Sequence, residues 1–352
     1  SFVDVERTYD SFGFMTQELD PLNHATTYTP DSYNLYPSSV TNALNHTTSF
    51  LYDYSLGKPT QVTDANGGIL QSIYDGLDRV IEEKQSNPTT ASVLETKTTY
   101  SYTPQSVGMR TLKTDFLDAA VSRDAYTYTD GFDRPIQTRI EAESTNTFSV
   151  SDTIYDSREY LWKQSLPYFS TGSASTVTIT TPALLSTFTY DALGRTTNIS
   201  TAVGNTTTAY DQWASTVPDP RGKVKTFTRD AFDSLVQVQE NNNAAMYTTS
   251  YVYNGRGDLT NLTDALGNVR AFAYDGLSRR LSAQDLHTPT DTTFGTWAYS
   301  YDDAGNLLSS LDPKAQTIQY TYDNINRPTT ENFTGTAGIE VTNAYDSCAN
   351  GI

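Results

Sequence analysis

The hexapeptide YDALGR at residues 190–195 decides the fold of this chain, because it joins the end of a strand to a tight turn. Upstream of it, apolar and polar residues alternate up to Tyr190, and this period of two, with aromatic residues and threonine, is typical of a β-strand. Asp191, at the first turn position, can accept hydrogen bonds from backbone amides two or three residues on. Gly194, three residues later, suits the positive φ of a type I turn followed by a bulge. The hexapeptide therefore predicts a strand that ends in a hairpin turn.

The Tyr-Asp dipeptide of this hexapeptide recurs along the chain. Its copies are Tyr9-Asp10, Tyr52-Asp53, Tyr74-Asp75, Tyr155-Asp156, Tyr190-Asp191, Tyr210-Asp211, Tyr274-Asp275, Tyr301-Asp302, Tyr322-Asp323 and Tyr345-Asp346. A second kind of turn lies between copies and begins ten residues before the tyrosine position of the next one. Its clearest members are Asp64 to Gly67, Asp219 to Gly222, Asp264 to Gly267 and the turn that begins at Asp312. Two kinds of turn therefore alternate.

The spacing of the turns gives the length of the strands. In the N-terminal part, successive turns begin ten or eleven residues apart, at Asp10, Asp20, Asp31, Asn42, Asp53, Asp64 and Asp75. A four-residue turn leaves about seven residues for each strand, and strands joined by such turns are antiparallel. The rhythm is looser between about residues 76 and 190, where we expect insertions, and later returns. No long segment has a helical period. The sequence predicts an all-β fold in which antiparallel β-hairpin repeats form one continuous curved or spiral sheet, with residues 1–352 as a single repeat region.

The fourth turn position supports this interpretation. It is occupied by Gly13, Asp78, Asp133, Gly194, Asp233, Gly257, Gly305 and Asn326, against Glu159 and Ser278 in two copies. Gly, Asn and Asp are the residues that best tolerate the left-handed region. We therefore expect positive φ at Gly13, Gly194, Gly257 and Gly305.

Composition excludes several classes of function. The 352 residues include 23 Lys and Arg against 41 Asp and Glu, a net charge of −18, and 25 tyrosines. An acidic chain without a basic cluster favours neither nucleic acid nor anionic membranes as partners. No apolar run approaches the length of a membrane span. The single Cys348 cannot form an intrachain disulfide, and His24, His46 and His287 have no zinc-site spacing, so we expect no metal and no cofactor.

These motifs resemble the Rhs or YD-repeat family. The family pattern Tyr-Asp-x-x-Gly-Arg is intact from Tyr190 to Arg195. Close versions end at Arg79, Arg279 and Arg327, and a Gly-Asn-Leu variant follows Asp302 at Gly305, Asn306 and Leu307. The resemblance implies hairpins wound in a spiral around a hollow interior. In Tc toxins and Rhs effectors such a shell encloses a toxic C-terminal polypeptide, and in teneurins a related shell belongs to an adhesion receptor.

The resemblance also suggests what lies outside this sequence. The chain begins and ends inside the repeat pattern, so we expect it to be a fragment of a longer polypeptide that is secreted or displayed at the cell surface. The stretch from Asp219 to Gly222 resembles the Asp-Pro-x-Gly found where such shells end. Because it keeps the repeat register, we interpret it as an ordinary turn.

Two functions remain. The first is a non-enzymatic wall segment of a shell, with the rest of the longer chain and an encapsulated polypeptide as partners. The alternative is an adhesion or glycan-binding module whose partner is a glycan or a cell-surface protein. Enzymatic interpretations are weaker, because most aspartates belong to turns and no Gly-x-Ser-x-Gly elbow is present. The single aspartate per turn also disfavours calcium. We interpret His24 and His46 as turn residues, and the recurring tyrosines as packing residues whose hydroxyls reach solvent or a neighbour.

Overall fold

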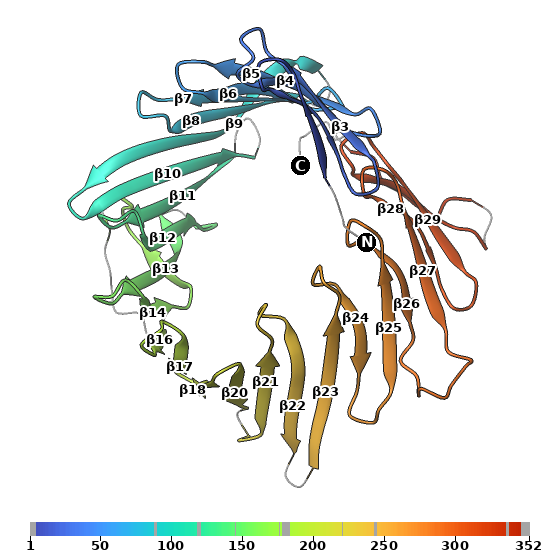
Figure 1. Cartoon of the computed structure of the whole chain (residues 1–352). Coiled ribbons are helices and arrows are strands. Elements are labelled where there is room, and N and C mark those ends of the chain that lie inside the picture. The colour runs from blue at the N-terminus through green and yellow to red at the C-terminus, as the bar shows by residue number, and fades with distance from the viewer. Residues whose placement is uncertain are drawn as a thin grey trace. The chain divides into compact units, whose positions relative to one another are not determined.

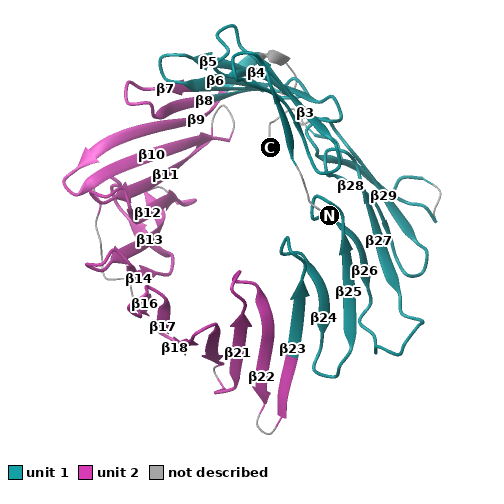
Figure 2. Ribbon diagram, in the orientation of Figure 1, with its two compact units in different colours: residues 1–72, 84–95, 249–351 teal, residues 73–83, 96–248, 352 magenta. Residues whose placement is uncertain are grey.

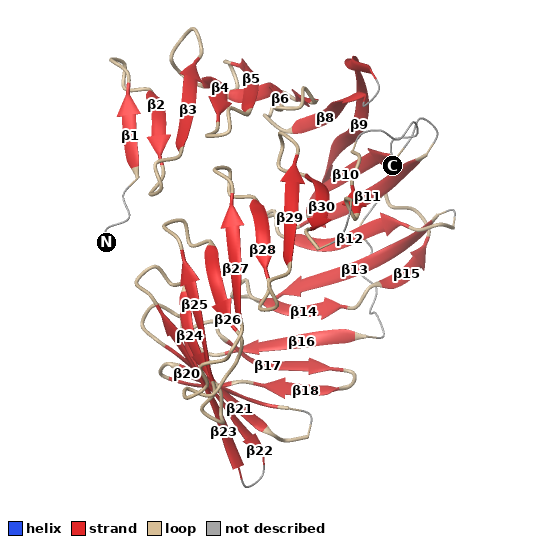
Figure 3. Cartoon of the chain, turned by 90° about the vertical axis from the view of Figure 1, so that its right-hand side faces the viewer, coloured by secondary structure: helices blue, strands red, loops and turns tan. Residues whose placement is uncertain are grey.

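The computed structural model describes residues 5–87, 90–117, 121–144, 146–175, 177, 184–219, 221–242, 245–335 and 338–345. Within these ranges every regular element is a β-strand (Figure 3), which confirms the predicted all-β fold of antiparallel hairpins. The described residues contain no helix that could span a membrane. Pro220, Asp346 and Cys348, which the sequence analysis singles out, lie outside the described residues.

The strands form two large sheets (Figure 1). The first sheet has 18 strands: β1 (Glu6–Tyr9), β2 (Met15–Leu19), β3 (Ala25–Pro30), β4 (Pro37–Thr41), β5 (Thr47–Asp53), β6 (Lys58–Thr63), β7 (Ile69–Tyr74), β8 (Val80–Asn87), β9 (Thr90–Gln105), β10 (Gly108–Phe116), β11 (Ser122–Thr129), β12 (Pro135–Glu141), β13 (Thr147–Tyr155), β14 (Leu161–Ser165), β15 (Tyr168–Thr171), β16 (Leu185–Tyr190), β17 (Thr196–Thr201) and β18 (Gly204–Thr207).

The second sheet has 13 strands: β19 (Ala209–Asp211), β20 (Ala214–Pro218), β21 (Val224–Arg229), β22 (Leu235–Asn242), β23 (Ala245–Tyr253), β24 (Leu259–Thr263), β25 (Val269–Tyr274), β26 (Arg280–Gln284), β27 (Thr296–Tyr301), β28 (Leu307–Leu311), β29 (Thr317–Tyr322), β30 (Pro328–Phe333) and β31 (Val341–Thr342). The repeat is therefore distributed over two sheets, with the division between β18 and β19.

The register of the hairpins explains the position of the recurring tyrosine within each repeat. In the β16–β17 hairpin, Thr189 pairs with Asn198 but Tyr190 pairs with Thr196, so the ladder shifts by one residue at the tyrosine. The same shift occurs at the tyrosine of the β25–β26, β27–β28 and β29–β30 hairpins. A bulge next to the turn is the geometry expected when a type I turn is followed by a left-handed residue.

The chain divides into two compact units, which Figure 2 distinguishes by colour. Unit 1 contains residues 1–72, 84–95 and 249–351, and thus unites the N-terminal hairpins with those that follow β23. Unit 2 contains residues 73–83 and 96–248, where the strands are longer and less regular.

The described residues contain very little closed hydrophobic core. Among these described residues, five hydrophobic ones are less than 9% exposed: Tyr128, Phe148, Val150, Ala174 and Ala283. Most strand residues are instead partly exposed, as in β6 and β17, where all six residues are intermediate. A two-layer sandwich would bury one face of every strand, so these sheets are predominantly single layers.

Among the described residues, a buried hydrophobic cluster lies in unit 2 at an insertion into the hairpin pattern. There β13 pairs with β14 through one half of its length and with β15 through the other, while β16 pairs with β14. Phe148, Val150 and Ala174 pack together, with Tyr126 and Tyr168 against them. The segment that leaves β15 thus folds back over β13.

Candidate functional site

Each turn is held by the aspartate at its first position. In the turn after β16, Asp191 Oδ1 accepts hydrogen bonds from the backbone N–H groups of Leu193 and Arg195, both at 2.9 Å. The Gly194 N–H donates to the Asp191 carbonyl at 3.2 Å, and the Asp191 N–H to the Arg195 carbonyl at 3.0 Å. The same pair of Oδ1 contacts recurs in the turns that begin at Asp10, Asp20, Asp64, Asp75, Asp130, Asp219, Asp230, Asp264, Asp275, Asp302, Asp312 and Asp323. The aspartates thus accept turn amides, but the two donors lie two and four residues on, and not two or three as the sequence suggested.

The predicted left-handed residues are also confirmed. The φ angles of Gly13, Gly194, Gly257 and Gly305 are +84°, +79°, +86° and +90°. Residues with a side chain occupy the same conformation in other turns, with φ between +61° and +70°, at Asp78, Asp133, Glu159, Asp233, Ser278 and Asn326. The turn at Asp53 is one residue longer, and there Gly57 takes the positive φ of +67°.

The residue four positions after the aspartate holds its second carboxylate oxygen. Arg195 Nε donates to Asp191 Oδ2 at 2.7 Å, and the equivalent arginines Arg79, Arg134, Arg279 and Arg327 make the same contact. Where arginine is absent, Asn268 and Asn306 donate through Nδ2, and His24 lies with Nδ1 2.9 Å from Asp20 Oδ2. The sequence analysis places Arg79, Arg195, Arg279, Asn306 and Arg327 in the turn motif but does not assign this contact to them, although the recurrence of Arg, Asn or His at this position is the signal that reveals it.

These contacts shift the acidity of the turn aspartates. The side-chain hydrogen bond from Arg79 lowers the pKa of Asp75 to about 2. The side-chain hydrogen bond from Arg134 and that from Asn268 likewise lower the pKa of Asp130 and Asp264. Burial by itself would raise the pKa of Asp275, but the hydrogen bonds from Arg279 and from the turn amides outweigh it and lower the pKa. The turns therefore favour ionised aspartates.

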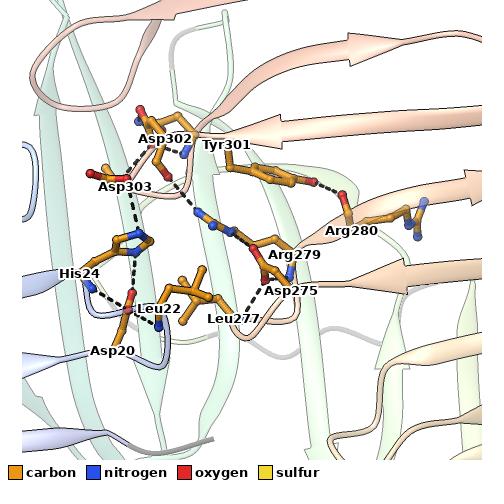
Figure 4. Close-up of polar contacts among 12 residues, drawn as sticks. Asp20, Leu22, His24, Asp275, Leu277, Arg279, Arg280, Tyr301, Asp302 and Asp303 are labelled. Carbon is orange, nitrogen blue, oxygen red and sulfur yellow. Dashed lines mark hydrogen bonds and ion pairs between the residues drawn. The ribbon is translucent and has the colours of Figure 1, made fainter. Parts of the chain in front are cut away.

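In most Tyr-Asp copies the tyrosine connects its own hairpin to the preceding turn on the same side of the sheet. The Tyr301 hydroxyl donates to the carbonyl oxygen of Arg280, which is the fifth residue after Asp275, at 2.9 Å (Figure 4). Six further tyrosines donate to the carbonyl of the equivalent residue, five after the preceding aspartate: Tyr102 to Val80, Tyr155 to Pro135, Tyr190 to Leu161, Tyr210 to Thr196, Tyr322 to Leu307 and Tyr345 to Pro328. The recurring tyrosines are thus packing residues with a fixed hydrogen-bond partner.

The arginine four residues after the turn aspartate also contacts the next copy of the repeat. The guanidinium of Arg279 lies 4.9 Å from the centre of the Tyr301 ring, and its NH1 donates to the Asp302 carbonyl at 2.8 Å. Arg79, Arg195 and Arg327 lie over the rings of Tyr102, Tyr210 and Tyr345 at 4.2, 4.3 and 4.4 Å. Cation–π contact with a tyrosine whose hydroxyl is already fixed makes neighbouring repeats mutually supporting.

Unit 1 also brings turns together that lie far apart in the sequence. Asn66 Nδ2 donates to Asp323 Oδ2 at 3.2 Å across 257 residues, and His24 Nε2 lies 3.4 Å from Asp303 Oδ1. Leu22 packs over Gly276, since a Cβ at Gly276 would lie 3.2 Å from Leu22 Cδ2. We call this row of contacts the seam. No local sequence pattern reveals it.

A small polar cavity of about 190 Å³ lies along the seam. Its lining includes Glu18, Asp20, His24, Asp303 and Asn326. Within the described ranges no group of three or more His, Cys, Asp or Glu has the arrangement of a metal site. His46, at the repeat position equivalent to His24, does not line this cavity, so the structure does not combine the two histidines into one site.

The apolar side chains at the turn tips divide according to whether the seam covers them. Phe12, Leu193, Phe232 and Leu266 are 78%, 77%, 90% and 83% exposed, whereas Leu22 in the seam is 36% exposed. All of them are the second residue after the turn aspartate. This position is therefore a contact point wherever another turn meets it.

Comparisons with protein families and with solved structures both find proteins similar to this chain. Residues 253–293 and 296–337 match the family described as RHS Repeat. Among curated proteins no sequence matches the chain. The fold is similar to the crystal structure of TcdB2–TccC3, with a TM-score of 0.58, 14% identity and coverage of 93% of this chain and 26% of the solved one. It is also similar to the Tc holotoxin pore of Photorhabdus luminescens, with a TM-score of 0.65, 15% identity and coverage of 96% and 22%.

The chain thus spans about a quarter of the length of the solved chains that it resembles. At these identities the likeness concerns the fold, and it covers nearly the whole chain, including the hairpins outside the matched repeats. Together with the match of residues 253–293 and 296–337 and the Tyr-Asp turns with their Arg and Tyr contacts, it supports the resemblance of the chain to the Rhs or YD-repeat family.

Proposed function

We propose that this chain is a non-enzymatic wall segment of a larger Rhs shell, which encapsulates a polypeptide carried outside residues 1–352. The observation that carries this proposal is the way the hairpins are held: Tyr hydroxyls and Arg guanidiniums link successive Tyr-Asp turns in most copies, in sheets whose described residues are mostly only partly buried. Such a sheet keeps its form without an underlying core. That property suits a wall, because both faces stay available.

The polar residues of the repeats support a structural role. Their carboxylates accept turn amides and the side chain of the fourth following residue, so they are already engaged within each turn. A hydrolase needs a nucleophile, a base and an oxyanion donor that converge on one point. The seam cavity offers carboxylates and His24 but no Ser-His pair, Cys or Lys in its lining. We therefore expect no turnover on glycans or peptides.

The partners follow from the same role. They are the remainder of the longer chain and an enclosed polypeptide, and the similarity to a Tc holotoxin favours a secreted or surface-associated protein. A net charge of −18 disfavours nucleic acid as cargo or ligand.

The test uses the native full-length product purified from its source. Intact-mass spectrometry defines the chain that contains these repeats, and limited proteolysis then follows the sequences outside them. A polypeptide enclosed by the shell should resist protease until the repeats are unfolded by denaturant. Digestion of every such sequence at the rate of an unfolded control would overturn the proposal.

An adhesion or glycan-binding role is the second candidate, and one observation favours it. Tyr33 and Tyr54, 66% and 46% exposed, make an edge-to-face pair with centroids 4.9 Å apart at a turn tip. Exposed aromatic rings can stack on sugars. Binding to a glycan panel that is lost in Tyr33→Ala, and kept in Tyr247→Ala at another exposed tyrosine, would favour this role over the shell wall.

A further inference from the structure

Unit 2 contains a cluster of hydrogen-bond donors that converge on a short extended segment of the chain. The segment is residues 172–175, Gly-Ser-Ala-Ser, which we call the strap; it leaves β15 and crosses β10, β11 and β12. Arg139 NH1 donates to the Ser173 carbonyl at 3.0 Å, and the Tyr128 hydroxyl donates to the Ala174 carbonyl. Arg110 NH1 donates to the carbonyls of Ala174 and Ser175 at 3.3 and 3.1 Å. Three strands thus bind three consecutive carbonyls.

The donors are held in place by contacts that do not involve the strap. Arg139 Nε donates to Gln137 Oε1 at 2.7 Å, and Gln137 Nε2 in turn donates to Asp152 Oδ1. Arg110 NH2 donates to Thr103 Oγ1 at 3.0 Å. Arg139, Gln137 and Asp152 are 5%, 1% and 1% exposed. A buried polar chain of this kind fixes its members in one geometry, so the donors are preorganised for carbonyl acceptors.

A pocket for one small side chain accompanies these donors. The methyl group of Ala174 is buried against Phe148 and Val150, with Tyr126 and Tyr168 at its sides. The Tyr126 and Phe148 rings are perpendicular, with centroids 5.8 Å apart. Burial raises the pKa of Tyr128, so its hydroxyl remains a proton donor at physiological pH. The site therefore combines recognition of main-chain carbonyls with selection for a small residue.

The strap leaves part of the hydrogen-bonding and charge-pairing capacity of the site unused. Arg110 and Arg139 are both cations, yet the strap offers them only neutral carbonyl oxygens, and neither takes part in an ion pair with a described residue. Arg110 Nε is buried without a hydrogen-bond partner among the described residues. A guanidinium binds a carboxylate about twice as strongly as a neutral acceptor. An acidic residue beside the alanine would therefore be a better occupant than the serines of the strap.

We propose that Arg110, Tyr128, Arg139 and the Ala174 pocket form a binding site for an extended polypeptide segment, which the strap occupies in cis. The ligand class is a peptide with a small residue in the pocket, bound through consecutive main-chain carbonyls and strengthened by a neighbouring carboxylate. The site requires only unit 2, and it would exist whether the chain is a shell wall or an adhesion module.

The first experiment empties the site by substitution and fills it in trans. Ala174→Trp introduces a side chain that the pocket among Phe148 and Val150 cannot hold, so the strap should leave. The probe is a fluorescein-labelled peptide STGSAS, residues 170–175, and fluorescence anisotropy measures its binding. It should bind the Ala174→Trp protein, but about tenfold or more weakly to the unsubstituted protein, whose site is already filled. Circular dichroism and thermal unfolding establish that the variant is folded.

Two further arms make the result specific. Adding Arg139→Met to Ala174→Trp should abolish peptide binding, whereas adding Arg123→Met, at a 55% exposed arginine of the same region, should leave it intact. The peptide with aspartate in place of its last serine should bind about tenfold more tightly. A folded Ala174→Trp protein that binds neither peptide, or binding that survives Arg139→Met, would overturn the proposal.

A variant of the intact chain tests the same site if Ala174→Trp does not fold. Ser175→Asp places a carboxylate next to Arg110, so it should raise the melting temperature of the protein. The rise should disappear when Arg110→Met is present, and should persist beside Arg123→Met. Absence of any rise, or a rise independent of Arg110, would contradict an anion-favouring site.

Discussion

The hydroxyl of Tyr301 donates a hydrogen bond to the carbonyl oxygen of Arg280, 21 residues earlier, at 2.9 Å. This contact gives the first residue of the Tyr-Asp motif a partner outside its own hairpin. Because the same relationship joins Tyr322 to Leu307 and Tyr345 to Pro328, turns on one side of the sheet form a chain of linked units. The repeat is therefore a device for connecting hairpins as well as for closing each one.

Removing the hydroxyl alone should weaken this connection measurably. Tyr301→Phe keeps the ring under Arg279 but leaves the Arg280 carbonyl without its donor, and we expect a loss of about 1 kcal/mol in the free energy of unfolding. Tyr299→Phe is the matched control, because Tyr299 lies on the same strand and its hydroxyl makes no hydrogen bond with described residues. Urea denaturation of both variants measures the difference. Equal losses would contradict the role assigned to the Tyr301 hydroxyl.

Substitution of two turn glycines should distinguish the loss of stability caused by backbone strain from the loss caused by a side-chain clash. Gly194→Val forces a β-branched residue to φ +79°, which costs on the order of 1–2 kcal/mol, and its Cβ would lie 2.6 Å from the Tyr160 hydroxyl oxygen. Gly257→Val meets the same backbone strain at φ +86° but has no atom within 4 Å of the new Cβ. Thermal unfolding should therefore show Gly194→Val as the more destabilised of the two. The reverse order would exclude the Tyr160 contact as a cause.

The lowered pKa values of the turn aspartates predict sensitivity of the fold to acid. The side-chain hydrogen bond from Arg79 holds the pKa of Asp75 at about 2 in the folded protein, below its ordinary value of 3.8. A carboxyl with a depressed pKa contributes stability above the unfolded value, and this contribution is lost as pH falls from about 4 through 2. Asp75→Asn should lower the melting temperature at neutral pH and flatten its decline over that acidic range. Glu143→Gln, at an exposed carboxylate, controls for the loss of one charge. A decline as steep in Asp75→Asn as in the unsubstituted protein would contradict this assignment.

The seam should respond to a side chain at Gly276. Gly276→Val would place its Cβ 3.2 Å from Leu22 Cδ2 and 3.4 Å from Pro21 Cβ, so the N-terminal turn must move away. Gly255→Val occupies the same position of another turn, where no atom lies within 4 Å, and serves as the control. Hydrogen exchange at the amides of Leu22 and His24, which donate to Asp20, should accelerate in Gly276→Val only. Unchanged exchange in Gly276→Val would mean that the seam is not tightly packed.

Local contacts explain why much of the fold can be predicted from the sequence. The turn requires Asp191 and Gly194 within four residues of each other, so their chemistry is visible as a spacing, and the positive φ of Gly13, Gly257 and Gly305 follows from it. The role of Arg195 could also have been inferred, because Arg, Asn or His recurs four residues after the turn aspartates.

Contacts between distant residues could not be predicted in this way. The partner of the Tyr301 hydroxyl depends on how neighbouring hairpins are aligned, and the seam joins Asn66 to Asp323 across 257 residues. The repeat period of about eleven residues does not indicate which distant residues come into contact in either case. The strap lies in an insertion without the repeat, so the burial of Ala174 has no periodic signal. The division of the strands into two sheets likewise reflects pairing beyond single hairpins.

The seam gives unit 1 a polarity. It joins turns of unlike kinds: plain turns of the N-terminal hairpins, such as those at Asp20 and Asp64, meet Tyr-Asp turns of the C-terminal hairpins, such as that at Asp323. Among the described residues, the contacts of the seam include neither the Tyr-Asp turns of the N-terminal hairpins nor the plain turns of the C-terminal hairpins. At these unused turns, Phe12 and Leu266 are 78% and 83% exposed. A contact between two unlike surfaces leaves one surface of each kind free for a further contact. A contact between two like surfaces leaves no such surface free. Rows of hairpins joined in this manner all keep the same orientation, because each row contacts one neighbour through its plain turns and the other through its Tyr-Asp turns.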